Sequence, residues 1–141
     1  MHLLEREPAG RLIAYPLRGL PEPTRRHFCA AVCEATLGRV ELAIPALIEA
    51  LSEFRSGTVT AQRRAAVAAV VHELDVAAGD LADRDDAGYE SAFRRARAAA
   101  AIEQALGTSG TAALETAYEA HHAGLALADI LGLLERFASQ S

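Results

Sequence analysis

The chain has 141 residues and a formal net charge of −5 at pH 7, which is the size of one domain. Hydrophobic residues, mostly Ala, Leu and Val, make up 51% of it, which excludes a disordered chain. The acidic balance disfavours a nucleic-acid partner, because proteins that bind nucleic acid usually carry a basic face. No apolar stretch approaches the roughly 20 residues of a membrane span, so we expect no membrane partner.

The first 23 residues differ from the rest because they contain four of the five prolines. Glu7-Pro8-Ala9-Gly10 is typical of a turn, with Leu3-Leu4 before it and Leu12-Ile13-Ala14-Tyr15 after it. We therefore expect residues 1–23 to form an extended arm or a short hairpin. A single α-helical domain over residues 24–141 follows.

The helical pattern begins at Thr24, which follows Pro23 and is suited to cap a helix. The apolar residues after it keep one helical phase through Gly38 and Pro45. We predict one long first helix over residues 24–56, bent near Pro45 because proline removes a hydrogen-bond donor and clashes with the preceding turn. Two helices in a shallow angle are the alternative. The apolar stripe consists of Cys29, Cys33, Val40, Ile44, Leu47, Leu51 and Phe54.

Four more helices are predicted by the remaining apolar pattern. Thr60 caps a helix that ends near Asp83, and the next one runs from about Gly88 to Leu106. A fourth helix follows Thr111, and a jump in helical phase at Gly124 separates it from a fifth over residues 126–138. The sequence thus predicts an all-α five-helix bundle with short connections.

Cys29 and Cys33 are four residues apart on one helical face. A metal site needs two further soft ligands, and a redox pair favours C-x-x-C at a helix N-terminus. Since both thiols follow the apolar stripe, we interpret them as core residues. Two cysteines without a secretory signal favour a reducing cytoplasm. We expect neither a metal nor a cofactor.

The smallest acid–base site that the sequence offers is His121 with Glu103, beside Tyr118. His121 falls on the apolar stripe of the fourth helix, between Tyr118 and Leu125. Glu103 shares an arc with three alanines of the third helix, where burial would raise its pKa. The alternatives are an interior or interfacial His121 and an exposed or salt-bridged Glu103.

Charged residues gather near Gly88. An acidic corner there would steer a basic protein partner toward the chain. Arg94, Arg95 and Arg97 form a basic cluster on the next helix, which we interpret as a solvated face and, alternatively, as a phosphate or acidic-partner site. The acidic corner consists of Asp80, Asp83, Asp85, Asp86 and Glu90.

Three segments form one sequence pattern, RRHFCAAVCEA at residues 25–35, PALIEAL at 45–51 and GTVT at 57–60. Together they resemble helical immunity proteins of bacterial toxin–immunity systems, in which a similar opening helix precedes an apolar helix and a short turn. The resemblance covers about residues 24–78. It implies an inhibitor-like binding role and no catalytic residue.

From the sequence we expect a small cytoplasmic interaction module that binds a protein partner, itself, or both. The chain contains 32 Ala and no Lys, which is typical of a high-GC bacterial genome. Alanine-rich helices approach closely but bury little area each, so a homodimer is expected. The alternative is a small helical enzyme or ligand-binding protein of a bacterial biosynthetic pathway, with His121 and Glu103 as its acid–base pair.

Overall fold

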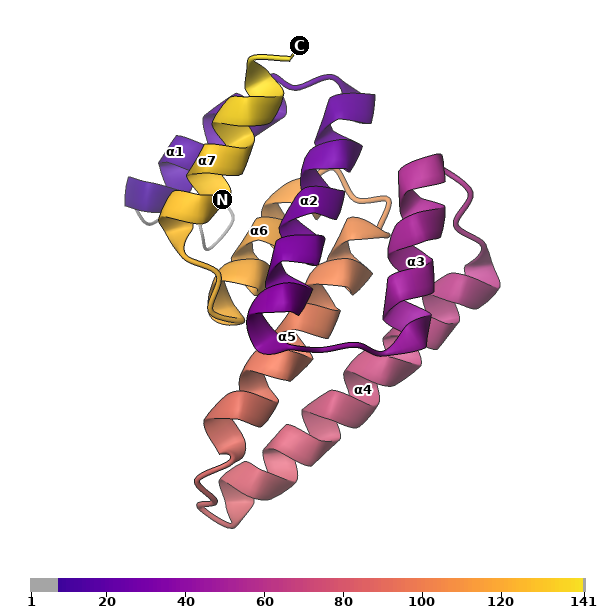
Figure 1. Cartoon of the computed structure of the whole chain (residues 1–141), viewed down its shortest axis with the longest axis vertical. Coiled ribbons are helices and arrows are strands. Elements are labelled where there is room, and N and C mark those ends of the chain that lie inside the picture. Colours follow the sequence, from indigo (N-terminus) through magenta and orange to yellow (C-terminus); the bar gives the residue numbers. More distant parts are fainter. Residues whose placement is uncertain (1–7, 141) are drawn as a thin grey trace.

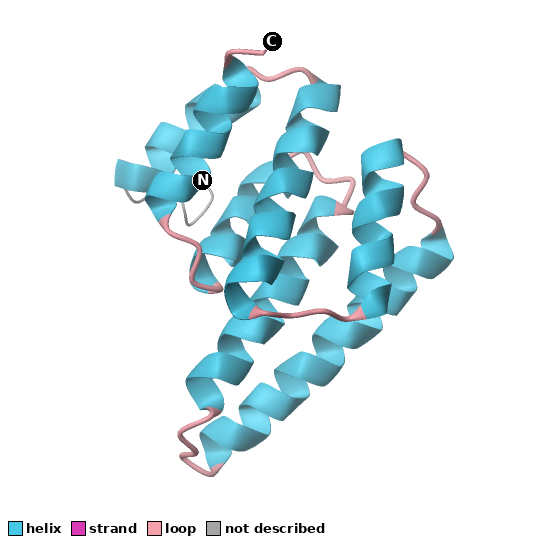
Figure 2. Cartoon of the chain, viewed as in Figure 1, coloured by secondary structure: helices cyan, strands magenta, loops and turns pink. Residues whose placement is uncertain are grey.

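The computed structural model describes residues 8–140. Within that range the chain forms seven α-helices and no strand (Figure 1, Figure 2). The helix α5 contacts α2, α3, α4 and α6, and the two end helices α1 and α7 contact each other. The helices are α1 (Pro8–Arg18), α2 (Glu22–Val40), α3 (Pro45–Ser56), α4 (Ala61–Asp83), α5 (Tyr89–Ala105), α6 (Ala112–His122) and α7 (Leu127–Ala138).

The expectation of an extended arm or hairpin is wrong for the part of residues 1–23 that forms α1. Ile13, Ala14 and Leu17 follow helical spacing and are buried in the common core. Pro8 stands at the first helical position, where the missing N–H of proline removes no helical hydrogen bond. Leu3-Leu4, the other half of the expected hairpin, lies outside the described residues.

The predicted bent helix over residues 24–56 is also wrong, because two antiparallel helices, α2 and α3, replace it (Figure 1). Glu41 ends α2 in the left-handed conformation (φ 54°), and Ile44 is extended (φ −92°, ψ 122°) before Pro45 begins α3. Proline disfavours the helical conformation of the residue before it and is favoured at the first position of a helix. The connection of residues 41–44 has about as many residues as one helical turn. The helical spacing of apolar residues in the sequence therefore continues across the break.

The four later helices agree with the prediction, so the bundle has seven helices in its described part instead of five. Thr60 caps α4 by accepting a hydrogen bond from the Arg63 N–H at 3.0 Å. The break between α6 and α7 falls at Gly124, whose φ of 106° favours glycine. α4 has 23 residues, yet neither α4 nor any other helix of residues 8–140 is both long and apolar enough to cross a membrane.

Alanine forms much of the core around α5. The run Ala98–Ala101 is buried on every side because other helices surround α5. Small side chains bring helix axes toward the short end of the roughly 8–10 Å range of packed helices. Phe28 is the largest fully buried side chain, and its ring meets the edge of Phe137 of α7 at 6.4 Å.

Candidate functional site

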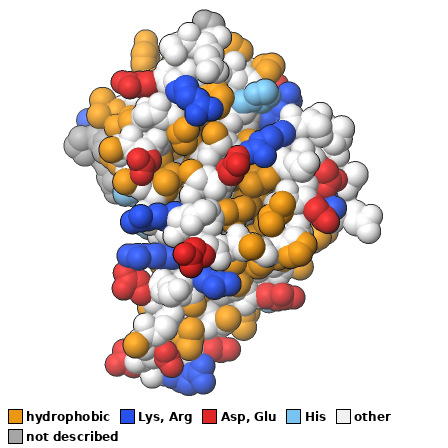
Figure 3. All heavy atoms as spheres, in the orientation of Figure 1, with side chains coloured by type: hydrophobic (Ala, Val, Ile, Leu, Met, Phe, Trp, Pro, Cys, Tyr) orange, Lys and Arg blue, Asp and Glu red, His pale blue; other side chains and the backbone are white. Residues whose placement is uncertain are grey.

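The helices α4 and α5 form a hairpin that extends beyond the ends of the other helices (Figure 1). Its turn is shaped by Asp85, which has a positive φ of 51°, and by Asp86, whose Oδ1 accepts a hydrogen bond from the Gly88 N–H at 2.7 Å. Acidic side chains lie at this end of the molecule together with a basic one (Figure 3), and the exposed Arg84, the C-cap residue of α4, stands between Asp83 and Asp85. All residues of the predicted acidic corner are exposed: Asp80, Asp83, Asp85, Asp86 and Glu90.

Two of these carboxylates lie where the helix itself disfavours them. Asp80 and Asp83 belong to the C-terminal end of α4, which has no basic residue in its last turn. The negative end of a helix dipole repels acidic side chains, at a cost of about 0.3–1 kcal/mol each. Since neither residue stabilises α4, their exposure favours a role in recognition.

Glu90 differs from the other acidic residues of the corner. It lies in the first turn of α5, where a carboxylate is favourable, and its Oε1 pairs with Nη2 of Arg94 at 2.7 Å. Both side chains are largely exposed, so the pair contributes little to stability. We therefore assign Glu90 a local structural role, distinct from that of the aspartates.

The hairpin also exposes apolar side chains beside its carboxylates. Val76 is 49% exposed and Tyr89 is 39% exposed. Val76, Asp80 and Asp83 follow i, i+4 and i+7 spacing, which places them on one face of α4. Tyrosine is enriched in protein interfaces, and charged side chains belong to their polar rim.

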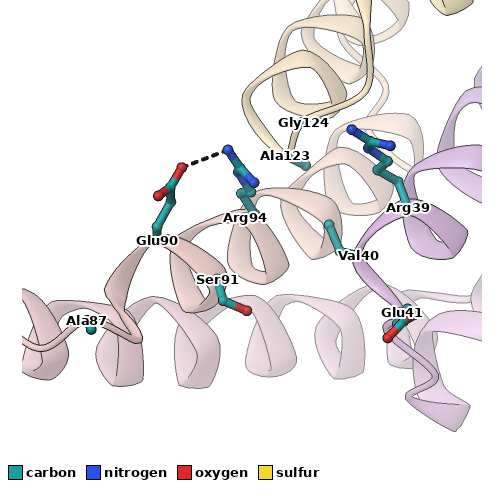
Figure 4. Close-up of a pocket in the computed structure, with 9 residues that line it drawn as sticks. All are labelled: Arg39, Val40, Glu41, Ala87, Glu90, Ser91, Arg94, Ala123 and Gly124. Carbon is teal, nitrogen blue, oxygen red and sulfur yellow. Dashed lines mark hydrogen bonds and ion pairs between the residues drawn. The ribbon is translucent and has the colours of Figure 1, made fainter.

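A cavity of about 440 Å³ lies at the base of the hairpin, between the end of α2, the start of α5 and the turn after α6 (Figure 4). Arg39 and Arg94 reach it from α2 and α5. Arg39 and Glu41 form no ion pair within the part of the chain that the structure describes. The charges on its lining balance because Glu41 and Glu90 accompany the two arginines. The cavity therefore does not select one sign of charge.

A second polar cluster joins the sides of α4, α5 and α6. Nη1 of Arg97 pairs with Oε2 of Glu119 at 2.8 Å, and its Nη2 pairs with Oδ1 of Asp75 at 2.6 Å. The side chains of Arg97 and Glu119 are only 22% and 12% exposed. The predicted solvated face of the three arginines is therefore wrong for Arg97, whereas Arg94 and Arg95 are exposed. Neither Glu119 nor Asp75 was expected in a site.

Glu103 faces this cluster. Partial burial raises the pKa of its carboxyl first, and the charges of Asp75 and Glu119 raise that pKa further, while Arg97 lowers it. Glu103 is thus half-buried beside an ion-pair cluster. Among the described residues it forms no ion pair of its own, which the salt-bridged alternative would require. The cluster therefore concentrates three carboxylates around one guanidinium.

His121 does not join Glu103. It is exposed, and its Nδ1 lies 3.2 Å from the Leu125 carbonyl oxygen. Residues two apart in the sequence are rotated by about 200° around the helix axis. His121 therefore faces away from the side on which Glu119 meets Arg97. The Tyr118 ring packs against His122 in a tilted arrangement, with 4.4 Å between the centroids and 55° between the ring planes. The structure therefore does not assemble the acid–base site predicted from Glu103, His121 and Tyr118.

The two thiols are core residues, as predicted. Cys29 and Cys33 are free and buried. Burial raises the pKa of Cys29 to about 12 and raises the pKa of Cys33 well above its usual range. Both side chains are therefore protonated at neutral pH, and a thiolate is the form that acts as a nucleophile or a metal ligand.

Metal-binding geometry is absent from the described residues, where no three His, Cys, Asp or Glu side chains converge to hold an ion. Comparison with known protein families, curated proteins and solved structures finds no match to this chain. The functional argument therefore depends on the surfaces of the molecule itself.

Proposed function

We propose that this chain is a helical protein–protein interaction module that docks through the α4–α5 hairpin onto a basic protein. The observation that carries the proposal is the exposure of Asp80 and Asp83 at the disfavoured end of α4, beside Val76. Carboxylates steer a basic partner and set its orientation, and the exposed valine supplies apolar contact once the partner is bound.

The most concrete version of this function is an immunity or regulatory protein that neutralises a basic partner, such as a nuclease toxin, in a bacterial cell. The resemblance of residues 24–78 to immunity proteins and the acidic hairpin support that version. A cytoplasmic location is supported by the two free thiols, Cys29 and Cys33.

The test replaces Asp80 and Asp83 by lysine together. We expect the free energy of unfolding to rise by about 0.5–2 kcal/mol, because lysine complements the C-terminal end of the α4 dipole. We expect partner binding to be lost at the same time, because the steering charge is reversed. Urea denaturation measures the first effect. Affinity capture from a native bacterial lysate at two salt concentrations, with mass spectrometry, measures the second.

The control is Glu135→Lys on α7, which reverses one charge, half the change of the double variant, at an exposed residue away from the hairpin. It is expected to keep the captured partner. A partner that binds the Asp80 and Asp83 variant and the wild type equally, or that binds with no dependence on salt, would contradict the proposal.

Self-association is proposed as a second property of the same module. α4 exposes several alanines along its length, at Ala65, Ala68 and Ala69, and small side chains allow a second helix to approach closely. We expect a homodimer, which light scattering would report as twice the chain mass of 14.9 kDa. A solution mass of 14.9 kDa at every concentration tested would contradict this expectation.

A further inference from the structure

A second cavity, of about 280 Å³, lies at the other end of the molecule from the hairpin turn. It is enclosed by the start of α2, the end of α3, the end of α5 and the loop of residues 107–111 that leads into α6 (Figure 1). No residue of the acidic corner and no residue of the cluster around Arg97 lines this cavity.

Positive charge dominates this cavity, in contrast to the acidic chain as a whole. Arg25 and Arg26 line it together with a single carboxylate, Glu22. Nη1 of Arg26 lies 3.6 Å from Oε1 of Glu22, which is a loose contact. Arg25 has no ion-pair partner in residues 8–140. At least one guanidinium charge of the lining is therefore uncompensated.

Arg26 also has an unsatisfied hydrogen-bond donor. Its Nε is buried and forms no hydrogen bond within the described residues. A buried N–H group without an acceptor costs about 1–3 kcal/mol, so such groups usually face an ion, a water molecule or a ligand. This Nε is covered by protein atoms, so other atoms of the Arg26 side chain form its part of the cavity lining.

The loop side of the cavity adds neutral donors. Thr108 belongs to the lining with its hydroxyl group, as does Ala113 in the first turn of α6. Ser109 also lines the cavity, but its hydroxyl group is already hydrogen-bonded to Thr111. The Ala113 N–H has no acceptor within its own helix, because the first N–H groups of a helix extend beyond it. Thr111, which precedes α6, forms no side-chain capping hydrogen bond.

The rest of the lining limits the size and chemistry of an occupant. Phe54, Ala105 and the protonated thiol of Cys29 form an apolar wall. The cavity volume is just below the roughly 300–1,000 Å³ typical of drug-sized ligand sites, which is too small for a dinucleotide. It suits one anionic group on a compact apolar body.

We propose that this cavity binds a small oxyanion, a phosphate or carboxylate group carried by a compact ligand. Arginine forks match the paired oxygens of both groups and bind them bidentately. Arg25 supplies the uncompensated charge, Arg26 supplies a second guanidinium, and the loop before α6 supplies a hydroxyl group and backbone donors.

The experiment titrates the ¹⁵N-labelled full chain with inorganic phosphate, phenyl phosphate and benzoate at constant ionic strength. We expect saturable NMR shifts of the amides of Gly110, Ala112 and Ala113. Arg25→Gln is expected to weaken binding at least about tenfold, because a charge-assisted hydrogen bond contributes at least one factor of ten. This variant is expected to stay folded, since Arg25 has no partner to lose. Arg25→Lys keeps the charge but not the forked guanidinium, so its affinity should lie between those of the wild type and Arg25→Gln.

The control is Arg64→Gln, an exposed arginine of α4 that does not line the cavity, which should bind as the wild type does. Tighter binding of phenyl phosphate than of phosphate would assign a phosphate monoester, and tightest binding of benzoate would assign a carboxylate. Equal affinities of Arg25→Gln and Arg64→Gln, or no saturation by any probe at about 20 mM, well above a millimolar Kd, would overturn the proposal.

Discussion

Replacing Phe28 by alanine should lower the free energy of unfolding by about 3–5 kcal/mol, because the substitution removes a fully buried aromatic side chain and leaves a cavity. Phe28 lies on α2 and meets Phe137 of α7 edge to face at 6.4 Å. The chain has few aromatic residues, and the alanines around α5 have little freedom to fill the space. The melting temperature should fall by about 10–15 °C.

The control is Tyr15→Ala, since Tyr15 is an aromatic residue that is 81% exposed. It is expected to change the free energy of unfolding by less than about 0.5 kcal/mol. Urea denaturation of both variants, followed by circular dichroism, measures the difference. A loss below about 1 kcal/mol for Phe28→Ala would mean that α2 and α7 do not pack through this ring.

The helices after Thr60 were predictable from the sequence because their signals are local. A capping threonine and a glycine at a break act within one turn of the chain. The break between α2 and α3 was missed because its four residues keep the apolar phase of a continuous helix. The restriction that Pro45 places on Ile44 was the signal against a continuous helix.

The buried face of α6 was predicted only in part. Of the bulky residues that share one helical arc, Leu114 and Leu125 are buried, whereas Tyr118 is half-buried and His121 is exposed. Ala117 and Ala120 are buried as well, because small side chains let α6 approach the alanines of α5 closely. Glu119 lies beside that face and is therefore drawn toward Arg97.

Of the candidate functional surfaces, one was predictable from the sequence and one was not. The acidic corner was predictable because its residues are close in the sequence, at the end of α4, in the turn after it and at the start of α5. The cavity with Arg25 and Arg26 combines four segments that are distant in the sequence. Only the packing of α2 and α3 against the loop before α6 brings the arginines to that loop.

Replacing Arg97 by methionine should lower the free energy of unfolding by about 2 kcal/mol at pH 7. That value lies between the roughly 0–1 kcal/mol of an exposed ion pair and the roughly 3–5 kcal/mol lost when a buried one is broken. The variant leaves Asp75, Glu103 and Glu119 without their guanidinium, and Glu119 is 12% exposed. Arg95→Met on the same helix is the control, because Arg95 is exposed, and it should have little effect.

The pH dependence of that loss distinguishes the carboxylate cluster from simple packing. In the wild type the raised pKa of Glu103 means that the folded chain holds this proton more tightly than the unfolded chain does. The stability contributed by Glu103 therefore rises as pH falls through its raised folded pKa toward the pKa of the unfolded chain. Without Arg97 the pKa of Glu103 should rise further, because the cation that favours its charged form is gone. The difference between variant and wild type should thus be largest near pH 7 and shrink as pH falls.

Glu119→Gln in the Arg97→Met background then decides which group carries the loss. Neutralising Glu119 removes a largely buried charge that has lost its partner, so part of the stability should return at pH 7. Denaturation of the single and double variants across pH 4–8 measures both effects. A loss that stays constant across this range, with no recovery in the double variant, would mean that Arg97 stabilises the bundle through its contact with Phe93 and its aliphatic stem alone.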